Sequence, residues 1–182
     1  GIFIFIILFG FGNGLKNSFK EFFLDDATNI LYIESGKTSK PFKGYKASRR
    51  IEFETEDLFD IQKFFSFYLE YITPRITRGA KIKFKNEYGN YTTRAVAPSH
   101  QFAEKTIVFS GRYLNDTDIK QKKKVAVIGR LVARDLFGEE DPIGKFVDIG
   151  KTVFKVVGVF KDSGGDNEER FVYIPYTTRQ KM

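Results

Sequence analysis

The chain has 182 residues, of which 42% are hydrophobic and 29% are charged, and its formal net charge at pH 7 is +7. This composition is typical of a folded globular protein and excludes a disordered chain. The absence of cysteine and the presence of one histidine, His100, exclude disulfides, thiolate metal sites and any site that needs two histidines.

The N-terminal residues are apolar from Ile2 to Phe11. The run is about half of the roughly 20 residues that a membrane-crossing helix needs, and it lacks the basic flank and cleavage site of a secretory signal. A core strand or helix is one alternative, but the position of the run favours the outer end of a transmembrane helix over residues 1–12. Residues 13–28 predict an amphipathic stalk helix, because apolar side chains recur at helical spacing: Leu15, Phe19, Phe22 and Phe23.

Residues 29–34 alternate between apolar and polar side chains and predict a strand. A block marked as a loop by Gly36, Pro41 and Gly44 follows. It contains six cations and no acid between them: Lys37, Lys40, Lys43, Lys46, Arg49 and Arg50. A solvated loop is the simpler interpretation. The alternative is an arm that contacts an anionic partner, either a lipid headgroup surface or an acidic protein face.

A helix is predicted to begin with Thr55 as its N-cap and to end before Pro74. Its apolar face would consist of Leu58, Ile61, Phe65, Tyr68, Leu69 and Ile72. Residues 75–97 alternate on either side of a turn and predict a hairpin with a basic polar face. Another short strand is predicted from Ile107.

The second half predicts a compact series of short elements. Residues 124–129 form an apolar strand that ends in Gly129, and residues 130–138 form a short helix that ends at Gly138. Residues 145–160 predict a hairpin around a tight turn. Residues 162–169 read as a loop, and residues 171–175 as a final strand.

Several patterns in the sequence mimic functional motifs. The glycines of GEEDPIGKF are separated by five residues and the lysine is followed by Phe146, so the spacing of a nucleotide-binding loop is not met. No motif supports a catalytic role for His100, which we expect to be a surface histidine. Aromatic residues interleaved with basic ones on the 75–97 hairpin could stack on nucleic acid, but alternation between a core face and a polar face produces the same pattern.

Four segments of the second half follow one another in close order: GRYLNDTD (111–118), KVAVIGRLVARDLFG (124–138), DPIGK (141–145) and VFKVVGVF (153–160). Together they resemble the extracytoplasmic core domain of MacB-type ABC transporter permeases. The resemblance extends to ETEDLFDIQKFF (54–65) in the first half. One departure is Ala97, which stands where the family often has a glycine before the proline.

The resemblance implies an α+β fold of two small α/β subdomains with mixed sheets, preceded by the end of a transmembrane helix. A porter-like subdomain would span residues 29–110, with residues 171–182 returning to it, and a sabre-like subdomain would span residues 111–170. We expect Gly129 at a sharp turn from strand to helix, Gly144 in a turn, and Gly158 at a close approach of two backbones within the 145–160 hairpin.

The resemblance also implies a function. The chain would be a fragment of a non-catalytic permease without a cofactor, located in the bacterial inner membrane with this domain facing the periplasm or outside. It would couple cytoplasmic ATP hydrolysis to the export or envelope movement of an amphiphilic substrate. The expected partners are a cytoplasmic ABC ATPase, a second permease subunit and a periplasmic adaptor. The alternative is a basic nucleic-acid-binding domain, which the N-terminal apolar run disfavours.

Overall fold

The computed structural model describes residues 30–51, 53–161 and 167–179. The predicted transmembrane end at 1–12 and the predicted stalk helix at 13–28 lie outside the described residues. Within the described ranges, no helix combines the length and the apolar character that crossing a bilayer requires.

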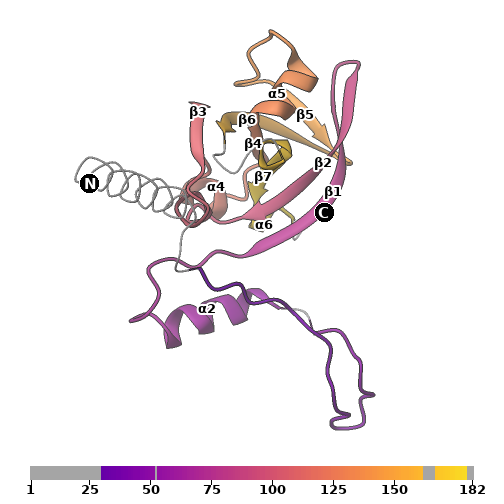
Figure 1. Ribbon diagram of the computed structural model, residues 1–182, viewed down its shortest axis with the longest axis vertical. Helices are drawn as coiled ribbons and strands as arrows, with labels where there is room; N and C mark the ends of the chain where they lie inside the picture. Colours follow the sequence, from indigo (N-terminus) through magenta and orange to yellow (C-terminus); the bar gives the residue numbers. More distant parts are fainter. Residues whose placement is uncertain (1–29, 52, 162–166, 180–182) are drawn as a thin grey trace, which may run out of the picture.

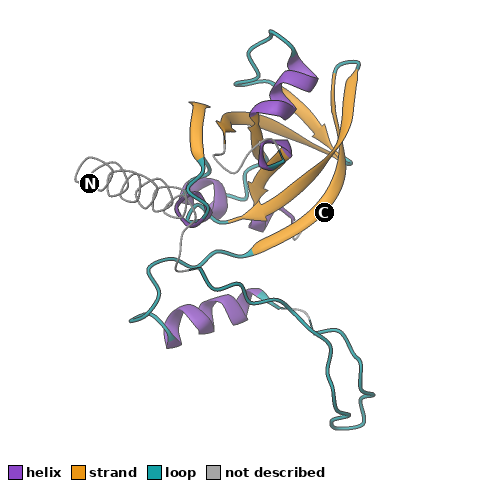
Figure 2. Cartoon of the chain, in the orientation of Figure 1, coloured by secondary structure: helices purple, strands orange, loops and turns teal. Residues whose placement is uncertain are grey.

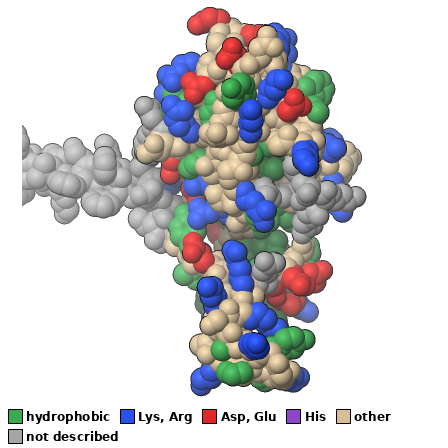
Figure 3. Space-filling view, turned by 90° about the vertical axis from the view of Figure 1, so that its right-hand side faces the viewer, with side chains coloured by type: hydrophobic (Ala, Val, Ile, Leu, Met, Phe, Trp, Pro, Cys, Tyr) green, Lys and Arg blue, Asp and Glu red, His purple; other side chains and the backbone are tan. Residues whose placement is uncertain are grey.

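The elements follow in the order α2 (Thr55–Phe64), β1 (Arg75–Phe84), β2 (Glu87–Val96), α3 (His100–Ala103), β3 (Ile107–Gly111), α4 (Asp116–Lys120), β4 (Val125–Gly129), α5 (Arg130–Phe137), β5 (Phe146–Ile149), β6 (Thr152–Lys161), the 3-10 helix η1 (Glu168–Arg170), β7 (Phe171–Pro175) and α6 (Tyr176–Arg179). Figures 1 and 2 show two parts, an upper body built on the strands and a lower part that contains α2 and a projecting arm. The space-filling view shows the lower part as the narrower one (Figure 3).

The body is a single mixed sheet of seven strands in the order β3-β6-β4-β7-β2-β1-β5. The sheet closes on itself, because β5 pairs with β6 as well as with β1. One edge of the long strand β6 therefore carries β5 along its first half and β3 along its second half, while β4 runs parallel to its other edge. The α+β class is confirmed.

The two predicted hairpins are confirmed. Strands β1 and β2 pair in an unbroken antiparallel register from Arg75↔Val96 to Phe84↔Glu87, so the turn between them is shorter than the five-residue NEYGN segment. In the second hairpin, β5 and β6 are joined at Gly150, whose φ of 62° is a backbone conformation that favours glycine.

Strand β7 joins the two ranges that the sequence assigns to different subdomains. It runs parallel to β2 along residues 171–175 and antiparallel to β4 at Val127 and Ile128. The strands of residues 75–96 and of residues 107–161 therefore share one sheet. The boundary at residues 110 and 111 stays a prediction.

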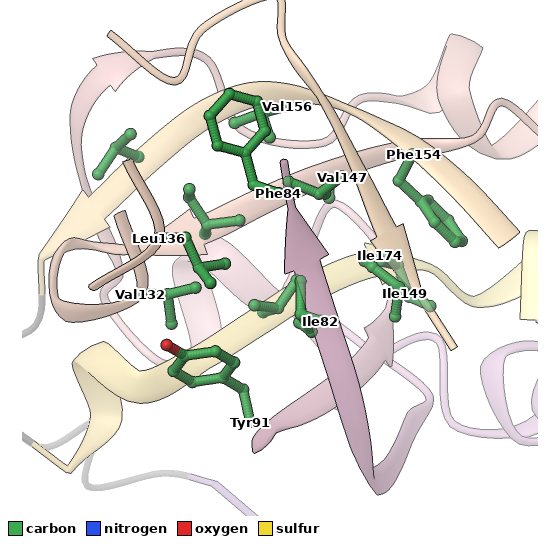
Figure 4. Close-up of a cluster of buried hydrophobic side chains, with 14 of the residues drawn as sticks. Ile82, Phe84, Tyr91, Val132, Leu136, Val147, Ile149, Phe154, Val156 and Ile174 are labelled. Carbon is green, nitrogen blue, oxygen red and sulfur yellow. The ribbon is translucent and has the colours of Figure 1, made fainter. Parts of the chain in front are cut away.

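The core has two layers, one on each side of β4. All five residues of β4 are buried, because the strand lies between two apolar clusters. Ala126 and Ile128 face the larger cluster, which α5 covers with Val132 and Leu136 (Figure 4). Val125 and Val127 face a smaller cluster on the other side of the strand.

Two of the three glycine predictions are confirmed, those for Gly129 and Gly144, whereas the backbone that approaches Gly158 is that of Arg112, outside the predicted hairpin. Gly144 lies in a turn with a φ of 82°. A Cβ atom on Gly129 would lie 2.0 Å from the carbonyl oxygen of Glu169, and one on Gly158 would lie 2.1 Å from the carbonyl oxygen of Arg112. Glycine is needed at both positions because another backbone occupies the space of a side chain.

The first half departs from prediction at two elements. Residues 30–34 are not a strand, and Leu31 and Ile33 are exposed. Alternation alone cannot form a strand when no neighbouring strand is present to bond its backbone. The helix α2 begins after Glu54 as N-cap and ends at Phe64, well short of Ile72. None of its residues is buried, so it lacks the packing that extends most protein helices.

Candidate functional site

The six predicted cations lie together on one projecting segment, residues 36–51, which we name the basic arm. Its two sides run antiparallel, with Lys37 opposite Arg50. Backbone hydrogen bonds cross between them: the Ile51 N–H donates to the Gly36 carbonyl at 2.9 Å, and the Thr38 N–H donates to the Arg49 carbonyl at 2.8 Å. The loop prediction is therefore refined, because this segment is a ladder that projects beyond α2 (Figure 1).

The tip of the basic arm is a tight turn of defined geometry. Phe42 and Tyr45 each donate their N–H to the other's carbonyl, at 3.2 and 3.0 Å. The two residues between them, Lys43 and Gly44, have positive φ values of 46° and 83°. Positive φ at both central residues is the signature of a type I′ hairpin turn, which favours glycine at its second position. The sequence F-K-G-Y thus specifies an ordered tip.

The basic arm is strongly cationic and fully accessible. All six cations are exposed: Lys37, Lys40, Lys43, Lys46, Arg49 and Arg50. No ion pair joins any of them to an acid in the part of the chain that the structure describes. Two of them instead approach the aromatic rings of the tip, with the Lys43 ammonium 5.4 Å from the Phe42 ring centre and the Arg49 guanidinium 4.4 Å from that of Tyr45. At the lower end of Figure 3, Lys and Arg side chains accordingly gather among hydrophobic ones.

A second group of charged residues lies where the first described residues meet the body. We name it the Glu104 cluster; its members are Tyr32, Arg75, Arg94, His100 and Glu104. One Glu104 carboxylate oxygen accepts hydrogen bonds from the Tyr32 hydroxyl and from the Arg75 guanidinium, both at 3.1 Å. The other oxygen lies 3.9 Å from Arg94. The Arg75 guanidinium also stacks on the Tyr32 ring, 4.6 Å from its centre.

His100 forms the buried side of this cluster, so the prediction of a surface histidine is wrong. The side chain is 1% exposed and its ring packs 4.9 Å from that of Tyr173. Its Nδ1 lies 3.1 Å from the Tyr113 hydroxyl. Burial, helped by the positive charges of Arg94 and Arg75, lowers the pKa of His100 to about 3. The imidazole is therefore neutral at pH 7.

The segment around DPIGK is a structural turn. The Asp141 carboxylate accepts the Ile143 N–H at 2.9 Å, and the Lys145 ammonium lies 2.9 Å from Glu140. Hydrogen bonds from Lys85 and Lys145 lower the pKa of Glu140, and the same Glu140 contact raises the pKa of Lys145. In a nucleotide-binding loop the lysine at this position would bind a phosphate, whereas here Lys145 is paired with Glu140.

Elsewhere on the described surface, charged side chains line a hollow. A hollow of about 350 Å³ lies between α5 and the β1–β2 turn, and ion pairs such as Lys85–Glu140 occupy its wall. Among the described residues, no group of three or more His, Asp or Glu side chains is placed to hold a metal ion. The basic arm and the Glu104 cluster are therefore the candidate sites that the described residues provide.

The comparisons with known proteins agree with one another. The family model of MacB-like periplasmic core domains matches residues 1–182. Among curated proteins, the chain is 27% identical over 171 residues to a macrolide export ATP-binding/permease protein MacB from Bdellovibrio bacteriovorus, covering 92% of this chain and 26% of the relative. It is 25% identical over 178 residues to the protein of the same name from Wolinella succinogenes, covering 95% and 27%. The chain thus spans about a quarter of the length of these relatives.

Solved structures support the fold. The extracellular domain of the noncanonic ABC-type transporter YknZ from Gram-positive bacteria aligns with a TM-score of 0.64 at 22% identity, covering 71% of this chain and 65% of that one. The periplasmic region of MacB from Actinobacillus actinomycetemcomitans aligns with a TM-score of 0.60 at 23% identity, covering 78% and 64%. These matches are transporter domains and give the nucleic-acid-binding alternative no support.

Proposed function

The chain belongs to the family of MacB-like periplasmic core domains, and from this premise we propose that it is the outward-facing part of an ABC transporter permease that couples cytoplasmic ATP hydrolysis to the movement of an amphiphilic substrate. The observation that carries the proposal is the family match along the whole chain. The domain is a non-catalytic part of a transporter. ATP hydrolysis would belong to a cytoplasmic ABC ATPase, in keeping with relatives named as ATP-binding/permease proteins.

The proposed setting is the bacterial inner membrane, with this domain in the periplasm or outside the cell. The proposed partners are the ATPase, a second permease subunit and a periplasmic adaptor. The proposed subdomain division places residues 29–110 and 171–182 in a porter-like unit and residues 111–170 in a sabre-like unit.

The proposed mechanism is rigid-body movement of packed units. Two features of the structure support it. The sheet closes on itself through the β5–β6 and β1–β5 pairings, which favours movement of the body as one piece. The Glu104 cluster ties Tyr32 to β1, β2 and the end of α3. Movement of the chain before residue 32 would therefore reach the sheet through this contact.

Topology tests the proposal directly. A reporter that is active only outside the cytoplasm, fused after Met182 in the full-length protein, is expected to be active. The matched fusion to a reporter that is active only in the cytoplasm is expected to be inactive. The opposite pattern would place residues 29–182 inside the cell and refute the proposal.

Transport tests the coupling role of the Glu104 cluster. We expect Tyr32→Ala in the full-length permease to reduce export of fluorescent amphiphiles from cells, because it removes both the hydroxyl bond to Glu104 and the ring under Arg75. Tyr88→Ala is the matched control, since Tyr88 is also exposed and also stacked against a cation, Lys81. Equal export by the two variants would exclude the cluster from coupling.

A further inference from the structure

The basic arm ends in two exposed aromatic rings surrounded by cations. We propose that this tip enters the headgroup region of an anionic membrane, with the rings of Phe42 and Tyr45 among the headgroups and the lysines against lipid phosphates. The inference deepens the proposed function by naming a partner, and it rests on that function only for the compartment that the arm faces.

The aromatic pair is the first observation. Phe42 and Tyr45 are 68% and 59% exposed. They are directly opposite each other in the hairpin, so their rings project from the same face. Single exposed apolar residues are ordinary on protein surfaces, but a pair at the end of a projecting arm has no neighbouring core to cover it. Aromatic rings with a polar edge are enriched at membrane interfaces.

The identity of the cations is the second observation, and it distinguishes a lipid surface from an acidic protein. Four of the six are lysines, and residues 35–51 contain no acid. Protein interfaces are depleted in lysine, because the compact ammonium is strongly hydrated and lacks the planar fork of arginine. A charged lipid surface attracts any point charge, and each basic residue near it strengthens binding by about fivefold.

The order of the tip is the third observation. The Phe42–Tyr45 hydrogen bonds and the turn at Lys43 and Gly44 hold both rings in place before any contact is made. A preformed site loses less conformational entropy on binding than a flexible loop does. The ammonium groups of the surrounding lysines can contact lipid phosphates while the lysine alkyl chains pack against the aromatic rings.

The sequence offers a clean reporter for this contact. The chain contains no tryptophan, so Tyr45→Trp introduces a single tryptophan as the reporter at the tip. Tryptophan also keeps the stacking of the Arg49 guanidinium. Tyr88→Trp is the matched control, because Tyr88 is 64% exposed and has the Lys81 ammonium 3.9 Å from its ring centre. It lies near the β1–β2 turn, at the end of the molecule away from the arm (Figure 1).

In the experiment, the full 182-residue chain is mixed with vesicles of phosphatidylcholine, with or without phosphatidylglycerol, and tryptophan emission is recorded. We expect Tyr45→Trp emission to shift to the blue only in the anionic vesicles and the shift to reverse at high salt. Adding Lys40→Gln, Lys43→Gln and Lys46→Gln should weaken the association of the tip about 100-fold and abolish the shift. Tyr88→Trp emission should not change.

Three results would overturn the inference. The first is no blue shift of Tyr45→Trp in anionic vesicles, and the second is an equal shift in neutral ones. The third is a shift that requires an added acidic adaptor protein, which would identify a protein as the partner of the arm. None of these measurements involves transport, so an outward-facing reporter combined with a silent tip would leave the proposed function intact and reject only the lipid contact.

Discussion

Acidification should destabilise this domain through one buried side chain, His100. The imidazole is 1% exposed, and the charged groups around it come from three elements: Arg75 on β1, Arg94 on β2 and Glu104 at the end of α3. Burial is the main cause of its lowered pKa, and the two arginines add to it, so the value falls to about 3. In the unfolded chain the pKa of a histidine is about 6.5.

The direction of the effect follows from this difference. Between pH 6.5 and about 3 the unfolded chain binds a proton that the folded chain does not, so acid favours unfolding. The stabilising contribution is complete above pH 6.5 and is lost as the pH falls toward the folded-state value. The slope is about 1.4 kcal/mol per pH unit within this window. From about pH 7.5 to 5.0 the free energy of unfolding should fall by about 2 kcal/mol from this residue alone.

Urea denaturation at these two pH values measures the effect. His100 is the only histidine of the chain, so a His100→Gln variant removes the whole histidine contribution and leaves the carboxylates unchanged. The variant will be less stable at pH 7.5, but the loss between pH 7.5 and 5.0 should be about 2 kcal/mol smaller than in the parent chain. The corresponding difference in thermal midpoint is about 4–8 °C for a domain of this size.

If the His100→Gln variant does not fold, an NMR titration of His100 in the parent chain tests the same lowered pKa. The ring protons of a single histidine give an isolated NMR signal whose shift reports its protonation. The signal should stay in its neutral position from pH 7.5 to 5.0 in the folded chain. A midpoint near 6.5, or parallel pH dependence in the parent and His100→Gln, would show that the imidazole is solvated and would refute its burial.

Three further outcomes are expected. Asp118→Asn should lower the free energy of unfolding by about 2–3 kcal/mol, because the fully buried carboxylate accepts two hydrogen bonds from Arg112, at 2.6 and 3.1 Å. Lys123→Gln is the control and should cost less than about 0.5 kcal/mol, since the Lys123 ammonium lies 3.9 Å from the same carboxylate. Equal losses in urea denaturation would contradict the stabilising role of the Arg112–Asp118 contact. Gly129→Ala should lower the free energy of unfolding by at least about 2 kcal/mol, because the new Cβ would lie 2.0 Å from the carbonyl oxygen of Glu169. Gly79→Ala is the control: its Cβ would meet nothing within 4 Å, so its thermal midpoint should not change. Calorimetry should detect no micromolar ATP binding to the isolated chain, and a measurable isotherm would reopen the nucleotide interpretation of the DPIGK turn.

Local patterns were sufficient to predict most of the body from the sequence. The β5–β6 hairpin follows from alternation around a glycine turn, and α5 follows from three inward positions and Gly138 at its end. The residues that form each pattern lie within about ten positions of one another, so each element can be predicted without knowledge of the rest of the fold. The apolar strand that ends in Gly129 is likewise present as β4.

Two of the failures share a physical cause, namely dependence on distant partners. Residues 30–34 have the alternation of a strand but no neighbouring strand in the described structure. His100 is polar and follows a proline turn, which suggests exposure, yet Tyr113 and Tyr173 come from later elements to cover it. The basic arm shows both outcomes. Its charges are explicit in the sequence, whereas the turn that pairs Phe42 with Tyr45 is local, and its sequence F-K-G-Y was interpreted only as part of a loop.

The segment GRYLNDTD (residues 111–118) is anchored to the sheet through Arg112. The backbone of Arg112 passes against Gly158 of β6, where its N–H donates to the Val157 carbonyl at 2.9 Å. Its guanidinium donates two hydrogen bonds to the carboxylate of Asp118, the last residue of the same segment. The chain is therefore fixed to the sheet at the predicted boundary between the two subdomains. A hinge needs residues that are free to change their backbone angles. Because Arg112 is bonded both to β6 and to Asp118, we expect the two predicted units to move together.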